Sequence, residues 1–122
     1  MPILEVQPVL DDGVTIDAGL ARRVADAAAQ VYGSAPGRVW VRLAPRPAAQ
    51  YAENGIDADV TPRPVFVTVL HAQPPAGEAL EREVQALTRA LAAVFARAPE
   101  RVHVQIAPAA SGRQAFGGML LP

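Results

Sequence analysis

Pro2 is the residue of this sequence best suited to unusual chemistry. It directly follows Met1, and a small second residue normally allows the initiator methionine to be removed. The mature chain then begins with a secondary amine at the head of the apolar stretch 3–6, whose strand-forming residues anchor it to a sheet. A free α-amino group titrates near ~8 in peptides, and burial lowers this pKa because the charged form is disfavoured. Pro2 is therefore a candidate general base near neutral pH. The alternative is that it is merely a second residue compatible with methionine removal.

Other catalytic chemistries find little support in the composition. The chain has no cysteine, which excludes disulfides, thiol nucleophiles and cysteine-ligated metals. Its two histidines, His71 and His103, lack the spacing of metal ligands, so we expect neither a metal nor another cofactor. His71 ends an apolar run, and we interpret it as structural. The net charge of −1, with scattered arginines, argues against a nucleic-acid partner.

The length of 122 residues suits one domain. The apolar run 90–96 is too short to span a membrane, and the first residues lack the pattern of a signal peptide. We therefore expect a soluble, cytoplasmic protein without a membrane partner.

The clearest pattern along the chain is an internal repeat. Residues 35–45 read APGRVWVRLAP and residues 98–108 read APERVHVQIAP, so seven of eleven positions are identical at an offset of 63. A bias toward alanine and proline does not explain the shared Arg-Val-x-Val in register. The chain is therefore predicted to be one domain built of two repeats, about 1–62 and 63–122.

Each repeat is predicted to be a strand–helix–strand unit. Apolar runs at 2–7 and 64–71 are typical of strands, and apolar residues recur at helical spacing over 17–32 and 78–97. Strands joined by a helix are almost always parallel, with a right-handed crossover. The sequence thus predicts an α+β fold in which duplicated β-α-β units form a four-stranded mixed sheet with two helices on one face.

The repeated strands indicate what the other face of the sheet carries. Valines and a leucine alternate with Arg38, Trp40 and Arg42 in the first copy, and with His103 and its polar neighbours in the second. The valines and the leucine are expected to pack on the helices, and the residues that alternate with them are expected on the helix-free face. That face must be polar or buried in an oligomer. Trp40 is the only tryptophan, and a subunit interface or ligand site suits it better than a fully solvated face.

The connection 45–63 is long for a compact domain and contains Tyr51 and the tight-turn signal Asn54-Gly55. Long connections are usually functional or act as linkers. In the second half, 114–118 is the matching region. The apolar segment 119–121 is expected to form a short strand or to cover a neighbouring chain.

Taken together, Pro2 heading a strand, the two β-α-β units and a glycine-containing turn after each second strand resemble the tautomerase superfamily. This family includes 4-oxalocrotonate tautomerase and macrophage migration inhibitory factor. The resemblance covers the whole chain and implies a homotrimer. It also implies a cofactor-independent isomerase in which Pro2, after loss of Met1, acts as general base for keto–enol tautomerisation of a small carboxylated enol.

The resemblance also suggests a set of substrate-binding residues. Arg42 and Arg38 are the nearest substitutes for the family arginines that hold the substrate carboxylate, with Trp40 and Tyr51 as pocket walls. Tyr51 or His103 is expected to polarise the carbonyl oxygen. The chain departs from the family pattern in its turns 8–13 and 72–77, which contain no arginine, and it lacks the arginine pair of the dehalogenase branch.

Two non-catalytic interpretations remain beside the enzyme. One is a ferredoxin-like regulatory domain that binds a small ligand and does not need Pro2 as its first residue. The other is a trimeric scaffold of the tautomerase fold that binds a partner. An extension ahead of Pro2 distinguishes them, because it abolishes activity in the enzyme and leaves ligand binding intact in a regulatory domain.

Overall fold

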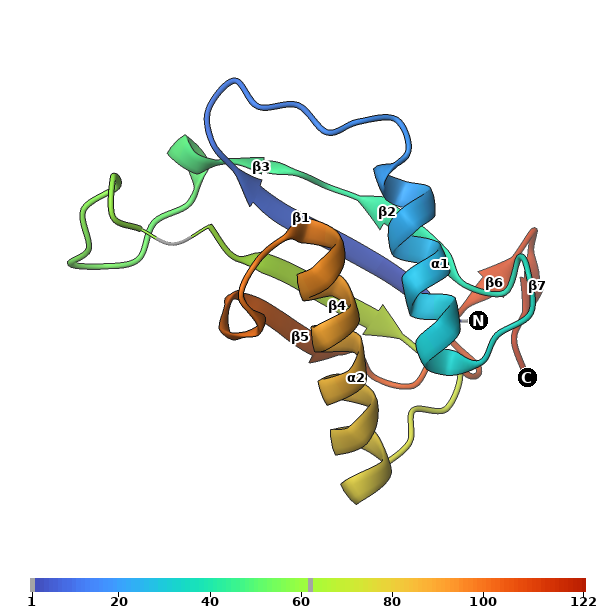
Figure 1. Cartoon of the computed structure of the whole chain (residues 1–122). Helices are drawn as coiled ribbons and strands as arrows, with labels where there is room; N and C mark the ends of the chain where they lie inside the picture. Colours follow the sequence, from blue (N-terminus) through green and yellow to red (C-terminus); the bar gives the residue numbers. More distant parts are fainter. Residues whose placement is uncertain (1, 62) are drawn as a thin grey trace.

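The main sheet of the computed structural model combines strands from both predicted units (Figure 1). The structure describes residues 2–61 and 63–122, in which the order across the sheet is β2 (Trp40–Leu43), β1 (Ile3–Leu10), β4 (Val65–Leu70) and β5 (Val102–Ile106). β1 is parallel to β2, β4 is parallel to β5, and the central pair β1–β4 is antiparallel. The predicted mixed sheet of two β-α-β units is confirmed.

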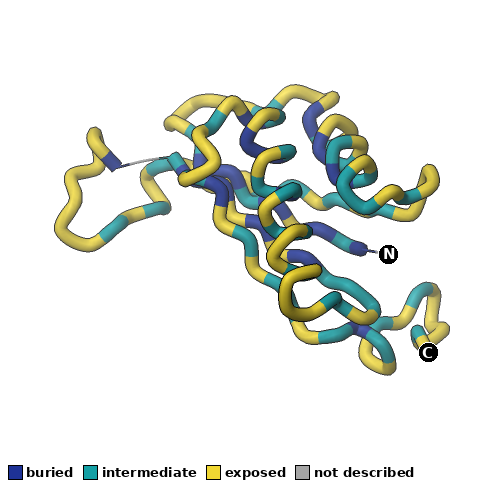
Figure 2. The backbone as a smooth tube through the Cα atoms, turned by 60° about the horizontal axis from the view of Figure 1, so that its bottom comes forward, coloured by how far each residue is buried: buried dark blue, intermediate teal, exposed yellow. Residues whose placement is uncertain are grey.

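Helices α1 (Leu20–Tyr32) and α2 (Gly77–Phe95) cover the same face of this sheet (Figure 1). Alternate residues of β1 and β4 point toward them, so Leu4, Val6 and Val67 are buried against Leu87 and Leu91. Figure 2 shows that the buried residues gather between the two layers. Burial of each such side chain contributes about 1.5–3 kcal/mol, which makes this interface the core of the domain.

The first helix begins later than predicted. α1 starts at Leu20 rather than at residue 17, because Asp17 forms a turn ahead of it. The Asp17 carboxylate accepts the backbone N–H of Gly19 at 2.9 Å, and the Asp17 carbonyl accepts the N–H of Leu20 at 3.2 Å. The helix ends at Gly33, whose φ of 62° lies in the left-handed region that glycine adopts without strain.

The long connection between the units contains structure that the sequence did not predict. β2 ends at Leu43 and β1 extends further, so an edge of β1 stays available. After Pro45, which lacks an N–H for the ladder, the chain forms the short strand β3 (Arg46–Pro47) against Val9 and Leu10. The 3₁₀ turn η1 (Ala48–Gln50) follows, and the next residues project beyond the sheet (Figure 1).

The carboxyl-terminal segment folds back beside the start of β1. After α2, the 3₁₀ turn η2 (Pro99–Arg101) leads into β5. β6 (Ala115–Phe116) and β7 (Met119–Leu120) then form a hairpin that confirms the expected short strand. Both turn glycines, Gly117 and Gly118, have positive φ, as tight hairpin turns require. The hairpin lies at the same end of the molecule as the amino terminus (Figure 1).

The helix-free face of the sheet is polar with large exposed aromatic side chains. Trp40 is 51% exposed and Phe66 is 36% exposed, whereas the intervening strand residues that face the helices are buried or half-buried. The predicted alternation of the repeated strands is thus confirmed. Among the described residues no helix is both long and apolar enough to cross a membrane.

Candidate active site

Pro2 lies directly before β1, at one end of this central strand. The residue is buried, and its carbonyl oxygen accepts a hydrogen bond from the backbone N–H of Trp40 at 3.1 Å. This bond belongs to the parallel pairing that continues with Ile3 beside Trp40. In an extended strand the N–H and the carbonyl of one residue point in roughly the same direction. In proline the ring carbon Cδ replaces that hydrogen, so the backbone fixes only that Pro2 lies beside the segment that enters β2.

A cavity of about 260 Å³ opens on that segment. Its wall is apolar apart from one guanidinium, and it consists of Ile3, Gly37, Arg38, Trp40, Phe116 and Leu121. The Trp40 indole is fixed from two sides. Its Nε1–H donates to the Gly37 carbonyl at 3.0 Å, and the Phe116 ring meets it edge to face with centroids 5.3 Å apart. The hairpin β6–β7 thus provides a wall of the pocket that the sequence did not assign to it.

The two candidate arginines differ in their partners. Arg42 Nη2 lies 3.2 Å from Glu5 Oε2 on the neighbouring strand, and both side chains are exposed. This pair borders a second cavity of about 300 Å³, which also contacts Ile3 and Trp40. Arg38 makes no ion pair within residues 2–61 and 63–122. A guanidinium without a carboxylate partner is better placed than Arg42 to bind a new anion.

Tyr51 and His103 do not meet Pro2 within one chain. Both contact Phe66, with ring centroids 5.8 Å from Tyr51 and 5.5 Å from His103. Phe66 pairs with Gln7 of β1, four residues along the strand from Ile3, or about 13 Å away. The five predicted substrate-binding residues are thus divided between the two ends of the helix-free face, with Arg38, Trp40 and Arg42 at the end where Pro2 begins β1 and Tyr51 and His103 at the other.

The environment of Tyr51 favours its neutral phenol. Its hydroxyl donates to Glu53 Oε2 at 2.6 Å. Desolvation, followed by the hydrogen bond and charge of Glu53, raises the pKa of Tyr51, while Arg101 opposes this. Tyr51 therefore remains a hydrogen-bond donor at neutral pH.

The two ends of the face are related by the internal repeat. Ile3 pairs with Trp40 in the first unit, and Phe66 pairs with His103 in the second, with both members displaced by 63 positions. By this register the counterpart of Pro2 is Val65, whose nitrogen is an amide in mid-chain and no base. One amine per chain is therefore available.

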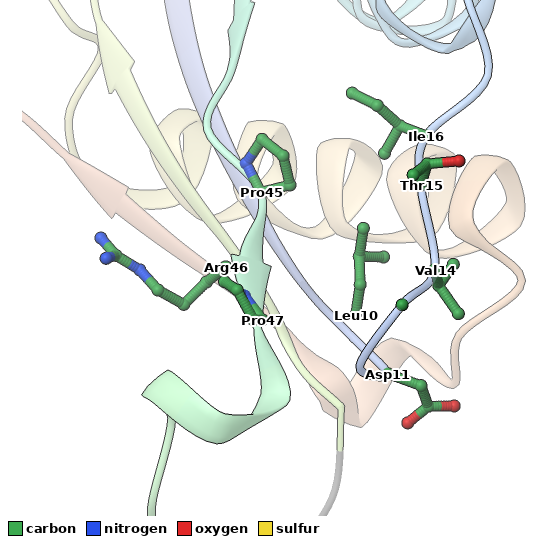
Figure 3. A pocket seen from close by; sticks show the side chains of 9 residues that line it. Leu10, Asp11, Val14, Thr15, Ile16, Pro45, Arg46 and Pro47 are labelled. Atoms are coloured by element: carbon green, nitrogen blue, oxygen red, sulfur yellow. The ribbon is translucent and has the colours of Figure 1, made fainter.

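A larger cavity, of about 310 Å³, lies at the far end of β1 (Figure 3). Leu10, Val14 and Ile16 line it, while the Arg46 side chain points away from them (Figure 3). Its charged groups have other partners, because Arg46 donates to Gln50 and Asp11 accepts from Arg63 at 2.7 Å. This cavity offers space but no set of reactive groups.

The comparisons with known proteins agree with this architecture. No protein-family model and no curated protein matches the sequence. A native fused 4-OT has 23% identity and a TM-score of 0.75 over 97% of this chain and 94% of that one. Pt0534, in a structure described as inactivated by 2-oxo-3-pentynoate, has 16% identity and a TM-score of 0.74 over the same shares.

The macrophage migration inhibitory factor from Trichinella spiralis has 10% identity and a TM-score of 0.72, covering 97% of this chain and 98% of that one. Two other fused 4-OT structures are described as an asymmetric and a symmetric trimer, with TM-scores of 0.70 and 0.72. The chain therefore has an α+β fold of duplicated β-α-β units. That fold is the one of the tautomerase superfamily, as the sequence resemblance predicted.

Proposed function

We propose that this protein is a tautomerase whose general base is the nitrogen of Pro2, freed by removal of Met1. The observation that carries this proposal is the position of Pro2, which is buried next to Ile3 in the wall of an apolar cavity that is also lined by Arg38, a residue without an ion pair among the described residues. An apolar surrounding disfavours the charged amine and keeps it able to accept a proton near pH 7. The fold of the tautomerase superfamily supports the same assignment.

The proposed reaction is the conversion of a small carboxylated enol to its ketone. Arg38 binds the substrate carboxylate, and Trp40 and Phe116 enclose the apolar part. The neutral Pro2 nitrogen removes the enol O–H proton, the oxygen becomes the carbonyl, and the same proton returns from Pro2 to the carbon. No atom is lost from the substrate, and the amine is regenerated.

We further propose that three chains assemble into a ring. The edge strands β2 and β5 are different, and a cyclic trimer joins different surfaces of neighbouring chains. Such an arrangement sets the β2 edge, with Trp40, against the β5 edge, with His103. Tyr51 and His103 of one chain then complete the Pro2 pocket of the next, where either polarises the substrate carbonyl. The trimers described for fused 4-OT structures support this assembly.

Mixing of inactive variants tests the shared pocket. A Pro2→Ala chain and a His103→Ala chain are each expected to lose activity, and their mixed trimers regain it. With random mixing, about a quarter of pockets combine an intact Pro2 with an intact neighbouring His103. No recovery would place both residues in the pocket of one chain, and a native mass other than about three chains of 12.8 kDa would exclude the trimer.

The Pro2 assignment is tested without knowledge of the natural substrate. Mass spectrometry is expected to find Met1 removed. The alkynone 2-oxo-3-pentynoate, which inactivates Pt0534, is expected to add to the Pro2 nitrogen and increase the mass by one whole reagent. In this conjugate addition an N–C bond forms, the triple bond becomes a double bond and the amine proton moves to carbon. A variant with one alanine inserted before Pro2 is the control and should not react there.

One observation favours a non-catalytic trimeric scaffold that binds a small ligand or a partner. Arg42, the arginine nearest to the family position on the second strand, is paired with Glu5. A scaffold should retain ligand binding after an extension ahead of Pro2, whereas the enzyme should lose its activity. Ketonisation of an enol acid such as phenylenolpyruvate, compared between the mature and extended chains, decides between the two.

A further inference from the structure

A buried polar cluster lies at the helix side of the sheet and has no role in the reaction proposed above. His71 Nε2 and Glu83 Oε2 are 2.7 Å apart, and their side chains are only 12% and 14% exposed. The Tyr32 ring meets the imidazole edge-on, with centroids 5.4 Å apart. The Tyr32 hydroxyl is buried and has no hydrogen-bond partner within the described parts of the chain. Three polar side chains, from α1, α2 and the end of β4, thus meet in the interior.

The register of the central strands brings this cluster to Pro2. β1 and β4 are antiparallel with Ile3 opposite Leu70, so the next pair in the same register is Pro2 opposite His71. Both residues directly adjoin these strands and are held by the backbone, because the Pro2 carbonyl accepts from the N–H of Trp40 and the His71 carbonyl accepts from the N–H of Ala110. Ile3 and Leu70 exchange the ladder hydrogen bonds, so Pro2 and His71 form the closer kind of pair, with Cα atoms about 4.5 Å apart.

The faces of the two residues agree with this pairing. Leu4 and Val69 are fully buried on the helix side, and side chains alternate along a strand. Pro2 and His71, each two positions away, therefore share that side. The proline ring therefore faces the cluster, while its nitrogen, a backbone atom, lies in the strand itself.

A carboxylate behind this ring has a chemical consequence. A general base becomes a cation when it accepts a proton, and a nearby opposite charge stabilises that cation. Salt screens a buried charge weakly, so the effect persists at physiological ionic strength. Glu83 is suited to this role because its hydrogen bond to His71 holds the carboxylate in one place.

We propose that the His71–Glu83 pair positions the Pro2 ring and stabilises the cation formed when the amino-terminal nitrogen accepts the substrate proton. This inference rests on the proposed function of Pro2. His71 Nε2 and Glu83 Oε2 hold each other by their hydrogen bond, and the Tyr32 ring holds the imidazole from α1. The positive charge of Arg38, on the cavity side, disfavours the Pro2 cation. The substrate carboxylate neutralises this charge of Arg38 when it binds.

The test compares Glu83→Gln, which keeps the shape and removes the charge, with Glu83→Asp, which keeps the charge. Glu81→Gln, on the exposed side of the same helix, is the matched control. The pKa of the Pro2 nitrogen is measured by NMR on mature protein labelled with nitrogen-15 proline. We expect Glu83→Gln to lower it by about one unit and to move the acid limb of the pH–rate profile equally. We expect kcat to fall about tenfold with KM within about twofold, because the pair does not touch the substrate.

The outcomes separate this inference from the proposed function. A wild-type Pro2 that retains Met1, or that titrates as an ordinary secondary amine, removes the base itself and with it the proposed function. A low wild-type pKa that stays unchanged in Glu83→Gln overturns the inference alone. A low value that moves in Glu83→Gln but not in Glu83→Asp or Glu81→Gln supports it. If Glu83→Gln fails to fold, the double variant Tyr32→Phe/Glu83→Gln is measured instead. Tyr32→Phe removes a buried hydroxyl that has no hydrogen-bond partner among the described residues, and this restores stability.

Discussion

The contrast between the two candidate arginines leads to the most direct test of the site. We predict that Arg38→Met weakens substrate binding strongly and that Arg42→Met weakens it little. Methionine keeps the apolar stem in both cases and removes the guanidinium. The prediction follows from the partners of the two groups, because Glu5 already holds Arg42 at 3.2 Å, whereas Arg38 has no such carboxylate among the described residues.

The expected magnitudes follow from the partners of each group. A hydrogen bond to a charged group contributes about 1.5–3 kcal/mol, so loss of the Arg38–carboxylate contact costs about 10- to 150-fold in binding. The Arg42–Glu5 pair is 71% and 50% exposed, and an exposed pair of this kind is worth about 0.2–1 kcal/mol. Removing Arg42 also frees Glu5, whose negative charge repels the substrate, so we expect a loss below about fivefold.

The assay is the initial rate of ketonisation of an enol acid, with inactivation by 2-oxo-3-pentynoate as a measurement that needs no natural substrate. We expect Arg38→Met to raise KM, or the reagent concentration for half-maximal inactivation, with kcat nearly unchanged. A raised KM with an unchanged kcat indicates that the substrate and the transition state have lost the same amount of binding energy. An Arg42→Met effect equal to or larger than that of Arg38→Met would refute the argument that the unpaired arginine binds the anion.

Three further predictions concern stability. Leu91→Ala should lower the free energy of unfolding by about 2–5 kcal/mol in urea titrations, because Leu91 is fully buried, while the half-buried Leu80→Ala should cost less than half as much. Arg97→Met should cost about 2–3 kcal/mol by the same measurement, because its guanidinium donates to the carbonyls of Val9, Arg63 and Phe95, and an equal loss in the surface variant Arg89→Met would contradict this reasoning. Burial, with a smaller contribution from the charge of Glu83, raises the pKa of the Tyr32 phenol above its ordinary value of 10. The folded state therefore binds this proton more tightly than the unfolded state, and the free energy of unfolding falls as pH rises above 10. Melting temperatures from pH 9 to 12 should fall less steeply in Tyr32→Phe, and parallel curves would disprove this.

The sequence predicted the architecture well because the signals are local. Alternation of apolar residues sets the face of a strand, and helical spacing sets the face of a helix, so the repeat at 35–45 and 98–108 was sufficient to predict two β-α-β units. The same alternation correctly set Trp40 and His103 on the helix-free face. The boundaries were less accurate: Asp17 forms a turn instead of the first helical residue, because its side chain competes for the backbone N–H of Gly19.

The composition of the candidate site depended on contacts between segments far apart in the chain. The pairing of Arg42 with Glu5 spans 37 positions, and it follows from the register of two strands that no local pattern reveals. The same is true of β3, which forms because β1 extends beyond β2 and leaves an edge to pair. The wall that Phe116 gives to the Trp40 pocket also depends on where the carboxyl-terminal hairpin folds back.

By itself, therefore, the sequence determined the main helices and strands, their faces and the duplication, since each follows from the order of neighbouring residues. The tertiary structure alone decided that Arg42 pairs with Glu5, that Tyr51 and His103 lie about 13 Å along the sheet from the Pro2 end, and that Glu83 meets His71. These depend on strand register and on the packing of helices against the sheet, where a shift of one residue turns a side chain to the opposite face.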